Sequence, residues 1–149
     1  MAIALGSNLG NREQCLRDAA AALGNSLVDL QLSSIHETDP IGVRDQPRFL
    51  NAAAIGDASL PARDLLTVLL TIERRFGRER PFKGAPRTID LDLILYGDAI
   101  IDEPGMQVPH PRFRERLFVL KPLAEIAPDW KDPVTGLTVA ELLARASGL

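Results

Sequence analysis

The alternation of apolar and polar residues predicts six elements over residues 1–96. In chain order they are a strand, a helix, two strands, a second helix and a final strand. Their predicted ranges are 2–5, 12–23, 28–33, 49–55, 61–76 and 89–96. This order is that of the ferredoxin-like fold, an antiparallel sheet with both helices on one face and an open opposite face. We therefore expect an α+β, ferredoxin-like βαββαβ sandwich.

Glycine, proline and the helical periodicity set the predicted element boundaries. Residues 6–10 predict a turn, and Asn11 is placed to cap the first helix. Proline near the first turn favours a second helix opening at residues 59–61. The residues expected to face the core from the two helices are Leu16, Ala19, Ala20 and Leu23, then Leu65, Leu69, Ile72 and Phe76.

Residues 97–149 do not continue this pattern and are expected to form a C-terminal extension. We predict a turn at Gly97-Asp98, a short strand over 99–101 and a rigid loop over 108–111. Short helices are predicted over 117–120 and 139–146. No internal repeat or linker divides the chain. Residues 1–149 are therefore expected to form a single domain.

Two aspartates interrupt the apolar strand at residues 89–96. Side chains alternate along a strand, so Asp90 and Asp92 point to the same face, with Cα atoms roughly 6.5–7 Å apart. Burying two carboxylates is costly unless a cation pairs with them. Spacing alone favours a solvated pair bridged to arginine. The apolar strand, which we interpret as central, and the basic loop before it favour a pair of Mg²⁺ ions with bound phosphates.

Charge and composition narrow the classes of partner. The net charge is −3, which argues against a general nucleic-acid binder. Basic residues nevertheless gather before the aspartates and again after residue 110, which suggests a small polyanionic ligand. The two groups are Arg74, Arg75, Arg78, Arg80, Lys83 and Arg87, and Arg112, Arg114 and Arg116.

The few remaining reactive residues carry weaker signals. Cys15 stands alone and is interpreted as a small core residue, which favours a reducing cytoplasm. No apolar run approaches the roughly 20 residues that span a bilayer. His36 is interpreted as structural. His110, between two prolines, is either a surface residue or a phosphate contact.

With these residues in hand, the chain resembles the 6-hydroxymethyl-7,8-dihydropterin pyrophosphokinase family. The family motif is a basic residue, any residue, a small residue, proline, arginine, two residues, D-[LIV]-D and two aliphatic residues. Residues 83–94 match it at every position. Supporting matches lie at residues 6–9, 38–42, 45–47, 50–53 and 108–110, and at Arg116 with Phe118.

The resemblance implies a ferredoxin-like fold and transfer of the terminal diphosphate of ATP to the pterin hydroxymethyl group in folate biosynthesis, with AMP as the other product. It implies two Mg²⁺ ions on Asp90 and Asp92, and charge neutralisation by Arg78 and Arg87. The implied pterin contacts are Thr38, Ile41, Phe49, Asn51 and Phe118. The implied ATP contacts are Glu73, Arg78, Arg80, Leu93, His110 and Arg116.

Two other classes of function remain open from the residues alone. A two-metal nucleotidyltransferase or cyclase also places paired aspartates on a ferredoxin-like sheet. A non-catalytic ferredoxin-like module that binds a small molecule or RNA is the second alternative, and the acidic composition counts against RNA. We expect a cytoplasmic monomer that acts on small molecules, without nucleic acid or membrane partners.

Overall fold

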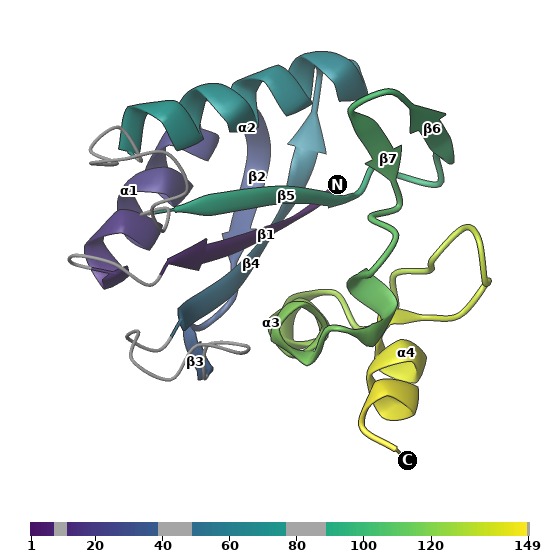
Figure 1. Ribbon diagram of the computed structural model, residues 1–149. Helices are drawn as coiled ribbons and strands as arrows, with labels where there is room; N and C mark the ends of the chain where they lie inside the picture. Colours follow the sequence, from purple (N-terminus) through teal and green to yellow (C-terminus); the bar gives the residue numbers. More distant parts are fainter. Residues whose placement is uncertain (8–11, 39–48, 77–88, 149) are drawn as a thin grey trace.

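The computed structural model describes residues 1–7, 12–38, 49–76 and 89–148 (Figure 1). The strands of the main sheet are β1 (Ala2–Ser7), β2 (Leu27–Leu32), β3 (His36–Thr38), β4 (Phe49–Ala58) and β5 (Asp90–Leu95). Strands β6 (Ile101–Glu103) and β7 (Met106–Val108) form a separate hairpin. The helices are α1 (Arg12–Leu23), α2 (Ala62–Phe76), the 3₁₀ turn η1 (Phe113–Glu115), α3 (Leu117–Ile126) and α4 (Val139–Ala146).

The main sheet has the strand order β2-β4-β1-β5, with β3 also pairing with β4, and every pairing is antiparallel. Helices α1 and α2 cover one face, as Figure 1 shows. Their apolar stripes pack with the strand residues that point the same way, such as Leu5 and Leu91. The predicted stripes are buried in both helices, except that Phe76 is only partly buried. The α+β ferredoxin-like prediction is confirmed.

The opposite face of the sheet is not open, which corrects the expectation. Helix α3 packs across one half of it, with α4 behind, and the strand residues beneath are small or apolar. Ala53 and Ile94 belong to this second core, together with Leu120 from α3 and Val139 from α4. The sequence predicted a short helix only over residues 117–120, whereas α3 continues through Pro122 to Ile126. Among the described residues, only the other half of this face, around Gly6 and Asp90, is left for a ligand.

Strand β5 lies at the edge of the sheet and not at its centre, since among the described residues it pairs only with β1. Leu91 and Leu93 are buried beneath α1 and α2, and Ile94 and Leu95 belong to the core beneath α3, so most of this edge strand is apolar apart from Asp90 and Asp92. A register shift between Ala2 and Ile3 sets Ile94 outside the ladder. Leu95 consequently joins Ile94 in the second core, whereas Tyr96 turns to the α2 side and its hydroxyl donates to the Leu60 carbonyl. The predicted alternation therefore ends at Leu93.

Two other strands differ from their predicted form. Strand β1 continues through Gly6 and Ser7, which were predicted to turn. Strand β2 contains Asp29 with φ 54°, and its pairing with β4 shifts register between Val28 and Gln31. This irregularity leaves Val28 exposed at 59% while Leu27 is buried, so the simple predicted alternation is wrong here.

The C-terminal extension is ordered around a buried ion pair. The Asp132 side chain is fully enclosed and accepts hydrogen bonds from Arg114 Nε at 2.5 Å and from a terminal Arg114 nitrogen at 3.0 Å. Helix α4 has the predicted bounds, and Thr138 and Glu141 form a capping box at its start. The predicted strand over 99–101 begins only at Ile101.

Cys15 lies on α1 and is half-buried, outside the main core. Burial nevertheless raises the pKa of its thiol, and Asp18 adds to the effect. Among the helices of the described residues, none is long and apolar enough to cross a membrane.

Candidate active site

The uncovered half of the second face carries a row of residues on four neighbouring strands, with polar side chains on β3, β4 and β5. Gly6 on β1 lies opposite both Asp90 on β5 and Asn51 on β4. Asn51 in turn lies opposite His36 on β3. Residues directly opposite one another in a sheet point to the same face. The pairing thus brings together residues of four strands, β1, β3, β4 and β5.

The residue at the centre of this row, Gly6, has no side chain. A Cβ atom added to Gly6 would lie 3.2 Å from Oδ1 of Asn51, so the Asn51 side chain extends over β1. Asn51 is only 5% exposed. In the next row Ala4 lies opposite Asp92. Gly6 and Ala4 therefore place no bulky side chain opposite either aspartate.

Asp90 and Asp92 are half-buried and lie on the same side of β5, as predicted. In the part of the chain that the structure describes, no group of three or more acidic, histidine or cysteine residues could enclose a metal ion. Two neighbouring carboxylates suit Mg²⁺, which retains waters and takes further oxygen ligands from phosphates. The residues present therefore fit a metal that binds together with a phosphorylated substrate.

His110 approaches this edge from the segment after β7. The main-chain N–H of His110 donates to the carbonyl of Ile94 at 3.1 Å. The ring Nδ1 of His110 accepts the main-chain N–H of Arg112 at 3.2 Å. Burial lowers the pKa of His110, Asp92 raises it, and Arg116 and Arg112 lower it, with a net decrease. The ring is therefore neutral at pH 7, and its proton lies on Nε2, since Nδ1 is an acceptor.

Arg116 and Phe118 stand at the start of α3, beside the uncovered half. The Arg116 guanidinium lies over the Phe118 ring, 5.5 Å from its centre. Phe118 is half-buried against the second core. Phe49, on the same face of β4 as Asn51, is also half-buried. The predicted pair of aromatic residues thus comes from the sheet and from α3.

Two residues expected at ATP have clear local roles. Glu73 on α2 accepts the N–H of Leu91 at 3.2 Å, which satisfies a main-chain donor of β5. The Leu93 side chain lies in the core beneath α1 and α2 and is 5% exposed. A nucleotide could therefore meet Leu93 only through its main chain.

Several predicted residues lie outside the described residues. These are Ile41, Arg78, Arg80 and Arg87, together with the basic loop and the residues of the predicted turn after Ser7. Thr38 is described through its main chain, which pairs with Phe49.

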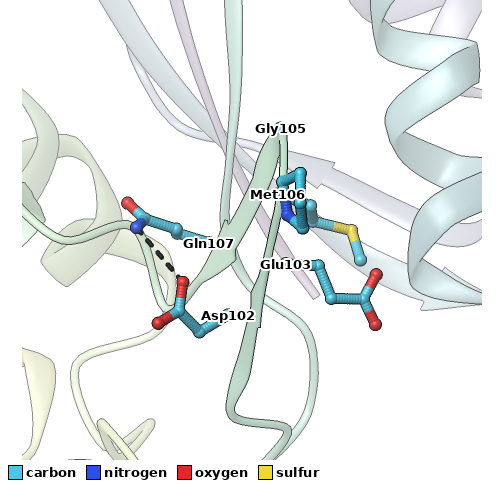
Figure 2. Close-up of a pocket in the computed structure, with 6 residues that line it drawn as sticks. Asp102, Glu103, Gly105, Met106 and Gln107 are labelled. Atoms are coloured by element: carbon cyan, nitrogen blue, oxygen red, sulfur yellow. Dashed lines mark hydrogen bonds between the residues drawn. The ribbon is translucent and has the colours of Figure 1, made fainter.

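A separate hollow lies on the β6–β7 hairpin (Figure 2). Gln107 donates to Asp102 at 3.3 Å on one side of the hairpin, while Met106 turns to the other side and into the helix-covered core. Glu103 pairs with Arg63 of α2 at 2.6 Å. The lining of this hollow includes Asp102 and Glu103 and is unsuited to a polyphosphate. The hollow is therefore a poorer candidate site than the sheet face that carries Asp90 and Asp92.

The sequence did not identify Gly6 and Ala4 as part of the site. Gly6 was assigned to a turn because glycine commonly ends strands. Only the register of β1 between β4 and β5 shows that these small residues lie beneath the ligand space. The available signal was the alternation of Ala2, Ala4 and Gly6 with larger residues at Ile3 and Leu5.

Known proteins share this sequence and fold. The model of the 7,8-dihydro-6-hydroxymethylpterin-pyrophosphokinase (HPPK) family matches residues 2–128. A 2-amino-4-hydroxy-6-hydroxymethyldihydropteridine pyrophosphokinase of Bacillus subtilis is 48% identical over 126 residues, which cover 83% of this chain and 75% of the relative. The folic acid synthesis protein fol1 of Pneumocystis carinii is 43% identical over 139 residues, 93% of this chain but 19% of fol1.

Among solved structures, wild-type HPPK-DHPS of Plasmodium falciparum with pteroate has a TM-score of 0.75 at 14% identity. The match covers 97% of this chain and 41% of that one, and it supports the fold. The sheet, the carboxylate pair and the sequence matches together define a pyrophosphokinase, an enzyme class of folate biosynthesis. The chain belongs to the 7,8-dihydro-6-hydroxymethylpterin-pyrophosphokinase family.

Proposed function

We propose that this chain transfers the terminal diphosphate of ATP to the hydroxymethyl oxygen of 6-hydroxymethyl-7,8-dihydropterin. The pterin oxygen forms a bond to the β-phosphorus and loses its proton. The bond from that phosphorus to the oxygen bridging it to the α-phosphate breaks, and AMP leaves. The observation that carries this proposal is the pair Asp90 and Asp92 on one face of β5, with the small residues Gly6 and Ala4 opposite them on β1.

Asp90 and Asp92 would hold two Mg²⁺ ions together with the ATP phosphates. Ions bound there neutralise phosphate charge and help to align the two substrates. His110 would donate from Nε2 to a phosphate oxygen, because its Nδ1 is already occupied by the N–H of Arg112. Arg116 would contribute a permanent positive charge beside it. These roles explain why neutral and cationic donors face the aspartates.

The pterin would lie between Phe49 and Phe118, with Asn51 addressing its polar edge. A flat ring gains from stacking on aromatic faces, and a buried amide selects a partner with matching donors and acceptors. Thr38 and Ile41 are proposed to complete this contact. The proposed role of Arg78 and Arg87 is to neutralise charge on the transferred group and the leaving oxygen. Glu73, Arg80 and Leu93 remain proposed ATP contacts.

We also propose that residues 1–149 form a single pyrophosphokinase domain that works as a cytoplasmic monomer on small molecules. The shared core of α3 and α4 supports one domain. The net charge of −3 supports the absence of nucleic-acid partners. Size-exclusion chromatography with light scattering tests the monomer.

The deciding experiment is incubation with ATP, Mg²⁺ and the hydroxymethyl dihydropterin, with both products followed by chromatography. We expect AMP and a diphosphorylated pterin in equal amounts. Release of free pyrophosphate instead would indicate a nucleotidyltransferase. Pterin binding without turnover would indicate a binding module.

A further inference from the structure

Strands β2 and β3 both pair with β4 at one edge of the sheet, and they are separated by a short segment that contains Ser33 and Ser34. Ser33 still pairs with β4, since its N–H donates to the Ala53 carbonyl at 2.8 Å and its hydroxyl accepts the Ala53 N–H at 2.8 Å. Ser34 instead directs its N–H to the Glu125 carboxylate at 2.6 Å. A side chain of α3 thus binds the main chain at the point where the edge strand is interrupted.

Glu125 collects three contacts from this segment. Besides the Ser34 N–H, its carboxylate accepts the Ser34 hydroxyl at 2.5 Å, and Nε2 of His36 lies 3.0 Å from Oε1. The hydroxyl and N–H of Ser34, followed by His36, hold the pKa of Glu125 at about 2. The carboxylate is therefore charged throughout the neutral range and always an acceptor.

The position of Glu125 in its helix is unfavourable by itself. It lies in the last turn of α3, where the helix dipole disfavours negative charge. The Glu125 side chain is 39% exposed and that of His36 is 31% exposed, and ion pairs at such sites contribute little to global stability. The cluster is therefore better suited to fixing local geometry than to stabilising the whole fold.

Of the two elements joined by Glu125, α3 carries one side of the proposed pterin site and β3 pairs with the strand that carries the other side. His36 and Thr38 of β3 pair with Asn51 and Phe49 of β4. Phe118 lies in the first turn of α3, which begins at Leu117. At about 1.5 Å per residue, Phe118 is roughly 10 Å along the helix from Glu125. Figure 1 shows α3 beside the end of the sheet where β3 lies.

We propose that Glu125 is a positioning residue for the pterin site: it ties β3 to α3 and so fixes the spacing between the Phe49–Asn51 side and the Phe118 side. This inference rests on the proposed function. Loss of the tie leaves Asp90 and Asp92 in place, because they lie on β5 at the opposite edge of the sheet. The effect should therefore fall on the pterin and not on ATP.

The test compares Glu125→Ala with Glu141→Ala. Glu141 is also an exposed helical glutamate that accepts a main-chain N–H, that of Thr138 at 3.1 Å, but it lies on α4. We expect Glu125→Ala to raise KM for the pterin roughly tenfold, as expected for lost hydrogen bonds to a charged group, with KM for ATP changed less than about twofold. Glu141→Ala should change neither constant.

Glu125→Gln keeps an acceptor oxygen and should restore part of the pterin affinity, and it serves as the folded variant if the alanine form does not fold. Unchanged pterin KM in both Glu125 variants, or equal changes for pterin and ATP, would overturn the positioning role. A wild-type chain that releases no AMP would overturn the proposed function itself, before any variant is compared.

Discussion

The chain holds carboxylates in two opposite settings. Asp132 is fully enclosed and accepts four hydrogen bonds, two from Arg114, one from the Thr135 hydroxyl and one from the Val134 N–H. Asp92 is half-buried, and no donor among the described residues forms a hydrogen bond with it. A carboxylate whose acceptor positions are filled by the protein has none left for a ligand. The comparison separates a structural acid from one that can bind metal and phosphate.

The largest effect on turnover is expected from Asp92→Asn and from Asp90→Asn, which alter the carboxylates proposed to bind metal. We expect each to abolish measurable turnover, a loss on the order of 10²–10³-fold or more, because charge stabilisation by the pair is lost. The fold should remain intact by circular dichroism. Asp98→Asn, in the exposed turn after β5, is the matched control and should be fully active. Near-normal activity in both site variants would remove the metal assignment.

Asp132→Asn is expected to lower the stability of the fold and to leave turnover unchanged. Removing one partner of a buried ion pair leaves Arg114 poorly compensated, and we expect the free energy of unfolding to fall by about 3 kcal/mol. Turnover per folded molecule should stay at the wild-type level. Urea unfolding measures the first quantity, and Asp129→Asn, an exposed neighbour, should change it by less than about 0.5 kcal/mol. A loss of turnover in folded Asp132→Asn would mean that the two settings are coupled.

Acid titration gives a smaller effect at the same residue. Burial alone would raise the pKa of Asp132, but the hydrogen bonds from Arg114, Thr135 and Val134 lower it from 3.8 to about 2. A lowered folded-state pKa stabilises the protein above about pH 4, and this stability is lost as the pH falls towards 2. The linked free energy is roughly 2 kcal/mol. The stability gap between wild type and Asp132→Asn should therefore narrow on acidification in urea titrations, and a constant gap would contradict this account.

The mildest change tests how far the ligand-binding half extends onto α3. Phe118→Ala should raise KM for the pterin roughly tenfold, the equivalent of one lost stacking contact, and KM for ATP by less. Phe118→Tyr keeps the ring and should stay near wild type. Steady-state kinetics with each substrate varied in turn measures both constants. Equal losses for the two substrates would show that Phe118 serves only the second core.

Features set by local periodicity could be predicted from the sequence. The range of α4, the buried stripe of α1 and the shared direction of Asp90 and Asp92 all depend on neighbours within a few residues. The motif over residues 83–94 then led to the correct family, although half of that motif, residues 83–88, lies outside the described residues.

Features set by distant partners could not be predicted. The break in the alternation of side chains at Ile94 depends on the register of β5 against β1. The coverage of the second face depends on where α3 packs on the sheet. The apolar composition of β5 suggested a central strand, but it reflects burial on both faces at an edge. Glu125 carried no sequence signal, because its partners Ser34 and His36 lie about 90 residues away.

The position of β5 at the sheet edge also bears on how the protein behaves at high concentration. An unprotected edge with apolar side chains on both faces is a template for pairing with another chain. Here the Glu73 carboxylate takes up the N–H of Leu91, and the N–H of His110 takes up the carbonyl of Ile94. These two contacts occupy main-chain groups that a second molecule would need. These contacts therefore oppose edge-to-edge pairing of the strand that carries the aspartates.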